Sequence, residues 1–173
     1  MKVAIFIAPS DFKDETVSSA RSLLEKWGVE GVITSMTMKE CKGYHGAVYK
    51  PQINSAYVNP DDFSAILLVD GIGVESYKLY ETKQLIDTVK MFYSSGKIVA
   101  AVGNAMKILA KASVVLNTKV AAPADPETKR IVMLYKGIPS ENEVEVQKNV
   151  ITAGKSDKTS ELVGLMLDSL GLK

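Results

Sequence analysis

The feature that most constrains the fold is a repeated alternation between short apolar runs and stretches of helical period. The runs are rich in Val, Ile, Leu and Ala and end at turn residues, which is typical of strands buried on both faces. We expect strands at 3–7, 31–37, 65–69, 98–102 and 150–152. The expected helices carry the stripes Val17, Ala20, Leu24 and Trp27; Leu85, Ile86, Val89 and Phe92; Ala105, Ile108, Leu109 and Ala112; and Leu162, Val163, Met166, Leu167 and Leu170. This alternation predicts an α/β fold built from βαβ units, with a mainly parallel sheet covered on both faces.

Other stretches are less regular. Residues 39–58 are punctuated by Gly43, Gly46 and Pro51, which indicates small strands and turns at one edge of the sheet. A short strand is expected at 119–122, and the residues of 131–135 and 144–146 predict a β-arm.

Size and charge set limits on the class of protein. A chain of 173 residues suits a single domain, residues 1–173, with a core that needs no disulfide or metal. The net charge of +1 leaves no electrostatic footprint for nucleic acid or an anionic membrane. No apolar run is long enough to span a bilayer, and the N-terminus reads as a first strand rather than a signal peptide. A single cysteine fits a reducing compartment, so we expect a cytoplasmic protein.

Functional residues are expected in the loops that follow the strands. In open α/β sheets, ligands bind beyond the carboxyl ends of the strands. Three loops qualify, at 9–15, 70–77 and 103–104, and all of them can lie on the same side of the sheet.

The sequence resembles the PfpI/ThiJ family almost from end to end. The resemblance is carried by KVAIFIAPSDFKDETVSSARSLLEKWG, HGAVYKPQINSAYVNPDDFSAILLVDGIG, FYSSGKIVAAVGNAMKILAKASVVLNTKVAA and EVEVQKNVITAG, in that order. It implies the flavodoxin-like α/β/α sandwich of class I glutamine amidotransferases, and a homo-oligomer, either a dimer or a larger ring.

The resemblance breaks at the strand-to-helix elbow. Relatives usually carry a cysteine there, in a pattern like Ala-(Ile/Val)-Cys-(His/Ala)-Gly-Pro, whereas residues 101–106 read AVGNAM. Gly103 therefore stands at the cysteine position and Asn104 at a position often filled by histidine. A nucleophile elbow strains its backbone by about 1–3 kcal/mol, which glycine relieves. Apart from the resemblance, a glycine here also suits any tight βα turn.

Glu15 aligns with a glutamate that relatives place beside the elbow cysteine. Without the resemblance it is simply an acid in the first turn of a helix, where the helix dipole favours it. Asp70 and Gly71 stand where relatives have a Pro-Gly-Gly loop that offers an amide to an oxyanion. The Gly71 and Asn104 amides could form such a pair, although Asp70 brings negative charge to it; Asp-Gly also suits a plain turn. The expected pocket comprises Glu15, Asp70, Gly71, Gly103 and Asn104.

Cys41 and His45 are four residues apart, but Gly43 between them disfavours a helix, and the resemblance places them away from the elbow. One cysteine and one histidine are too few for a zinc site. The Gly71–Gly73 segment is too short for a dinucleotide fingerprint. We therefore expect no catalytic residue of the family type, no metal and no cofactor.

Three functions stay open. The preferred one is a non-catalytic or altered-chemistry protein, with a binding or stress-related role, whose pocket takes a small-molecule ligand. The second is an active intracellular protease, amidase or glyoxalase-type hydrolase using other residues. The third is a structural or partner-binding homo-oligomer with a vestigial pocket. We also expect that a cysteine introduced at Gly103 has a depressed thiol pKa, because Glu15 and the helix N-terminus lie beside it.

Overall fold

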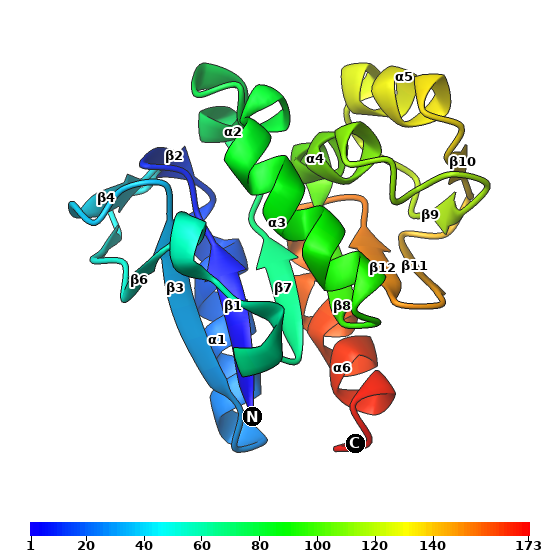
Figure 1. Cartoon of the computed structure of the whole chain (residues 1–173). Coiled ribbons are helices and arrows are strands. Elements are labelled where there is room, and N and C mark those ends of the chain that lie inside the picture. Colours follow the sequence, from blue (N-terminus) through cyan, green and yellow to red (C-terminus); the bar gives the residue numbers. More distant parts are fainter.

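A seven-stranded sheet forms the centre of the molecule in the computed structural model, which describes residues 1–173 (Figure 1). In spatial order its strands are β11 (Val144–Gln147), β12 (Val150–Ala153), β8 (Ile98–Val102), β7 (Ala65–Leu68), β1 (Lys2–Phe6), β3 (Glu30–Ser35) and β6 (Ile53–Asn54). Only β11 runs antiparallel to its neighbour, and every other pair is parallel. The predicted α/β class and mainly parallel sheet are confirmed.

Helices cover both faces of this sheet. They are α1 (Asp14–Lys26), α2 (Ile72–Ser76), α3 (Lys83–Ser94), α4 (Met106–Lys111), α5 (Pro126–Leu134) and α6 (Thr159–Ser169). The apolar residues of α1 and α6 pack in one core layer, and those of α3 and α4 in the other. Figure 1 shows the resulting three-layer sandwich, with α3 in front of the sheet and α6 behind it. None of these helices has the length and apolarity that crossing a membrane requires.

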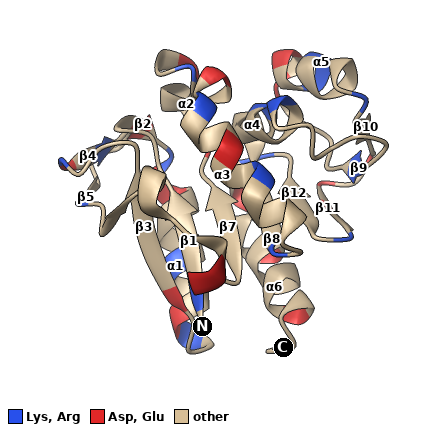
Figure 2. Ribbon diagram, in the orientation of Figure 1, with Lys and Arg blue, Asp and Glu red and all other residues tan.

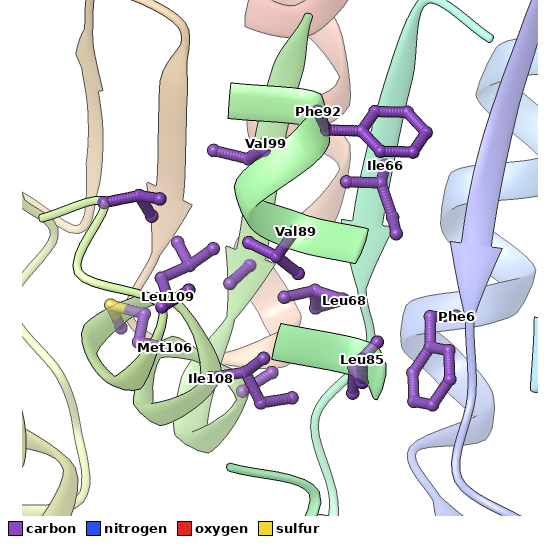
Figure 3. Close-up of a cluster of buried hydrophobic side chains, with 14 of the residues drawn as sticks. Phe6, Ile66, Leu68, Leu85, Val89, Phe92, Val99, Met106, Ile108 and Leu109 are labelled. Atoms are coloured by element: carbon purple, nitrogen blue, oxygen red, sulfur yellow. The ribbon is translucent and has the colours of Figure 1, made fainter. Parts of the chain in front are cut away.

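Strand alternation divides the core between the two faces. In β1, Val3 and Ile5 face the layer of α1 and α6, whereas Ala4 and Phe6 face the layer of α3 and α4. Figure 3 shows the second layer, in which Leu85, Val89 and Phe92 of α3 meet side chains from the strands. Fully burying such a side chain contributes about 1.5–3 kcal/mol. These two layers fix the strands and therefore the loops at their ends.

Two smaller sheets flank the main one. The first joins β2 (Ser10–Phe12), β4 (Cys41–Gly43) and β5 (Val48–Tyr49), and the second joins β9 (Lys119–Val120) and β10 (Ile138–Pro139). The small strands expected within 39–58 are thus confirmed. Asp14 fixes the β4–β5 turn, because its carboxylate accepts hydrogen bonds from the amides of His45 (2.9 Å) and Ala47 (2.8 Å).

The predicted β-arm is half wrong. Residues 144–147 form β11, which pairs with β12 as a hairpin, but residues 131–135 belong to α5 and its C-terminal end. The Asp125 side chain caps this helix by accepting hydrogen bonds from two backbone amides, and Pro126 occupies its first turn. These start signals outweigh the β-like pattern of the apolar residues that follow.

The chain crosses from one side of β1 to the other between β3 and β7. This order is the flavodoxin-like one, and its crevice lies where the loops after β1 and β7 separate. In Figure 1 these loops lie at the upper edge of the sheet, near α2 and α4, and both termini lie at the opposite edge.

Candidate functional site

The elbow is a left-handed turn at the end of β8. Gly103 has φ of +54° and opens a 3₁₀ turn over Gly103–Ala105 that leads directly into α4. A residue with a Cβ is disfavoured in this conformation by roughly 1–2 kcal/mol. The chain therefore has the backbone geometry of an elbow. The residue at the turn is glycine, which adopts this conformation with the least strain.

Asp70 lies directly beside Gly103. A Cβ built on Gly103 would stand 2.9 Å from Oδ2 of Asp70, closer than real Cβ contacts allow. The Asp70 residue is only 3% exposed, and its Oδ1 accepts a hydrogen bond of 2.7 Å from the Thr16 hydroxyl. No other residue donates to Oδ2. The space that a side chain at residue 103 would need is thus partly filled by a buried carboxylate.

The surroundings of Asp70 favour its neutral form. Burial raises the pKa of its carboxyl, while the Thr16 hydrogen bond and the positive charge of Lys13 oppose that rise. The negative charge of Glu15 adds to it. The net direction is upward, because removing a carboxylate from water outweighs one hydrogen bond and one partly solvated cation.

Asn104 closes a reciprocal pair of hydrogen bonds with Gly71. The Gly71 amide donates to Oδ1 of Asn104 (3.0 Å), and the Asn104 side-chain amide donates to the Gly71 carbonyl (2.8 Å). An isolated antiparallel β-bridge between Gly71 and Phe12 holds the same loop from the other side. The Gly71 amide is therefore engaged, and the oxyanion pair suggested for Gly71 and Asn104 does not form here.

A cavity of about 300 Å³ opens over Gly103. Four of the five expected pocket residues line it: Asp70, Gly71, Gly103 and Asn104. Its volume is at the lower end of the range of about 300–1,000 Å³ typical of small-molecule sites. The structure therefore brings four of the five predicted residues together around one cavity.

Glu15 is the exception. It is exposed in the first turn of α1 and lines a second cavity of about 200 Å³, beside Asp11, Tyr44 and His45. Both cavities share Lys13, Gly71 and Ile72, so they are neighbours, but Glu15 does not line the one over Gly103. His45, expected at the periphery, lies in the smaller cavity.

Cys41 lies in neither cavity. It is fully buried, and its thiol donates to the carbonyl of Lys39 (3.5 Å). Burial raises the pKa of this thiol, and a bond with Ser35 offsets only part of the rise. No group of three or more His, Cys, Asp or Glu residues is placed to hold a metal ion.

The sequence did not predict the ionic wall of the cavity. Lys107 is buried in α4 and pairs with Glu75 and, at 4.0 Å, with Asp125. The Tyr80 hydroxyl donates to the other oxygen of Glu75 (3.0 Å), and the Lys107 ammonium lies 5.4 Å from the Tyr80 ring centroid. Glu75 and Asp125 line the cavity. One signal was available, namely a lysine within the otherwise apolar stretch Met106–Ala110.

Two lysines complete the lining. Lys13 precedes α1, and its ammonium lies 3.5 Å from the Ser156 hydroxyl across the chain. Lys155 follows β12, a position that the strand-end rule would also have selected. Figure 2 shows acidic and basic residues side by side around α2, α4 and α5, rather than a face of one sign.

Comparison with known proteins places this site in context. The model of the DJ-1/PfpI family matches residues 1–168. The uncharacterized protein MJ0967 of Methanocaldococcus jannaschii is 35% identical over 164 residues, 95% of this chain and 79% of that protein. Deglycase PfpI of Pyrococcus furiosus is 29% identical over 119 residues, 69% of this chain and 70% of that protein. The crystal structure of a ThiJ/PfpI domain protein from Brachyspira murdochii superposes with a TM-score of 0.92 at 20% identity, covering 98% of this chain and 96% of the other.

Proposed function

Because the chain belongs to the DJ-1/PfpI family, we propose that it is a member without an elbow nucleophile, which binds a small molecule instead of transforming one. The observation that carries the proposal is the carboxylate of Asp70, 2.9 Å from where a Cβ of residue 103 would stand. The resemblance puts a reactive cysteine at this position in relatives. Where Asp70 is ionised, a thiolate here would lie beside a like charge, which raises the thiol pKa and disfavours the reactive form.

The remaining candidate nucleophile supports the same proposal. Cys41 is buried outside both cavities, and burial raises its thiol pKa. A nucleophilic cysteine needs the opposite conditions, namely exposure and a lowered pKa. The one histidine lines the smaller cavity and not the one over Gly103. Cysteine-histidine chemistry therefore has no assembled pair in this chain.

A second candidate is hydrolase or deglycase activity that uses other residues. It is favoured by the names of three Pyrococcus relatives, each a deglycase, at 29% to 30% identity. Such an activity would need a carboxylate or water as the attacking group, and Asp70 is the one buried acid at the elbow. A third candidate, a vestigial pocket in a homo-oligomer, stays a prediction from the resemblance.

The proposal is tested with the full chain and its Cys41→Ala variant. Neither should hydrolyse peptides, convert glyoxals or release glycated amines above the uncatalysed rate, whereas some small metabolites should raise the melting temperature. Ligand present at a hundredfold excess over its Kd stabilises by about 2.7 kcal/mol. Turnover abolished by Cys41→Ala would establish cysteine chemistry, turnover retained by it would establish the second candidate, and either result refutes the proposal. A melting temperature that no metabolite changes would favour the vestigial pocket.

A further inference from the structure

We infer that the cavity over Gly103 binds a small zwitterion of the α-amino-acid type, with its ammonium group on Asp70 and its carboxylate toward Lys13 and Lys155. The inference rests on the proposed function and adds the class of ligand. It is carried by the placement of a hydrogen-bond acceptor deep in the cavity and cations at its edge.

Asp70 supplies the deep acceptor. One of its oxygens is held by Thr16 at 2.7 Å, so the carboxylate cannot rotate away without losing that bond. The other oxygen points toward Gly103, receives no hydrogen bond from another residue, and belongs to a side chain that lines the cavity. No other residue of the chain donates to this oxygen, so a ligand that donates to it gains a hydrogen bond that the protein itself does not occupy. An ammonium group does so most strongly, because both partners are then charged.

The other acids of the cavity are already engaged. Glu75 holds the Lys107 ammonium with one oxygen and the Tyr80 hydroxyl with the other. Asp125 caps α5 through the amides of Glu127 and Thr128 and also accepts from the Thr128 hydroxyl. Asp70 is therefore the acid with an oxygen left for a ligand.

The edge of the cavity is cationic. The Lys13 ammonium lies 3.5 Å from the Ser156 hydroxyl and close enough to Asp70 to lower the pKa of its carboxyl. The Lys155 side chain is half exposed, with its ammonium 3.7 Å from Asp157. Neither contact is a short ion pair, so both ammonium groups are able to turn to a ligand carboxylate.

The charged groups of the cavity already sum to zero, which favours a ligand with no net charge. The lining carries two lysines and three acids, and the buried Lys107 behind it supplies the third positive charge. A simple anion has no amide to bind at Gly71, which already donates to Asn104, and would face Asp70. A zwitterion satisfies both ends of the cavity and leaves its charge unchanged.

The test is isothermal titration calorimetry on the full chain with the common L-α-amino acids. Each is compared with its N-acetyl derivative, which lacks the ammonium charge, and with the amine that lacks the carboxylate. We expect at least one amino acid to bind and both of its analogues to bind about tenfold or more weakly.

Asp70→Asn should weaken amino-acid binding by about tenfold to hundredfold. Lys155→Ala should weaken it several-fold. Asp168→Asn, the same change at an exposed position on α6, should leave the affinity unchanged.

Three outcomes would overturn the inference. They are equal binding of N-acetyl derivatives, an unchanged affinity in Asp70→Asn, and no binding by any amino acid. In each case the proposed function still stands or falls on the turnover assays with Cys41→Ala. Melting curves show that each variant is folded before it is titrated, so a loss of binding is not mistaken for a loss of structure.

Discussion

At the scale of single residues, the contact between Gly103 and Asp70 decides what the elbow can do. Gly103→Cys tests it, in a Cys41→Ser background so that one thiol is titrated. From the sequence, Glu15 and the helix N-terminus predict a depressed thiol pKa. Because Asp70 lies 2.9 Å from the new Cβ and Glu15 lines the other cavity, we now expect a thiol pKa above the usual value of about 8.5. The ultraviolet absorbance of the thiolate against pH measures it.

The matched control for this variant is the protein that carries both Gly103→Cys and Asp70→Asn. Removing the carboxylate should lower the thiol pKa relative to Gly103→Cys alone, since the helix N-terminus then acts without the opposing charge. Compared with the same protein carrying Gly103, each variant should lose about 1–3 kcal/mol of stability from the left-handed conformation at residue 103. A thiol that titrates below the ordinary value with Asp70 in place would show that Asp70 does not govern the elbow.

At the scale of elements, the loop after β7 is held between β2 and the 3₁₀ turn that precedes α4. Gly71 has φ of +136°, and a Cβ there would lie 2.5 Å from the Asp11 carbonyl oxygen. We expect Gly71→Ala to lower the free energy of unfolding by about 3 kcal/mol or more, from backbone strain and a clash with main chain that cannot rotate away. Urea unfolding measures the loss. Gly28→Ala is the control, because Gly28 also has positive φ but nothing within 4 Å. Its cost should be about 1 kcal/mol, and equal losses in the two variants would contradict the clash.

The same elements show what the sequence could and could not predict. Hydrophobic period located the main strands and helices, because burial on two faces leaves a clear pattern in Val3–Phe6 or in the stripe of α3. The rule that ligands bind in the loops after the strands selected Asp70, Gly71, Gly103 and Asn104, which line one cavity. The contacts of Lys107 with Glu75 and Asp125 were not predictable, since they join residues far apart in the chain. The prediction of a strand at 131–135 is wrong because a short apolar run fits either period, and the Asp125 cap is the signal that identifies a helix.

At the scale of the whole molecule, Asp70 links the site to the pH dependence of folding. Burial raises the pKa of its carboxyl above the unfolded value of about 3.9, so the folded chain holds this proton more tightly than the unfolded chain. Stability is then lost as pH rises from about 3.9 through the raised pKa, because ionising the buried group disfavours the folded state. Asp70→Asn removes this loss. We expect its melting temperature to match that of the wild type at low pH and to exceed it increasingly as pH rises toward neutrality, by about 2–4 °C for each kcal/mol gained.

Asp14→Asn supplies a control of opposite sign. Burial acts to raise the pKa of Asp14, but hydrogen bonds from the His45 and Ala47 amides outweigh it, and the net shift is downward. Its ionised form therefore stabilises the fold above about pH 4, and that stability is lost as pH falls through the lowered pKa. Asp14→Asn should melt below the wild type at neutral pH and approach it in acid. Thermal unfolding followed by circular dichroism across this range compares the three proteins.

If Asp70→Asn and Asp14→Asn shifted the melting temperature in the same direction at neutral pH, Asp70 would not be a buried charge kept at a cost to stability. If they diverge, the one acid at the elbow with an oxygen left for a ligand is also the one that weakens the fold, which is the arrangement expected of a group retained for binding.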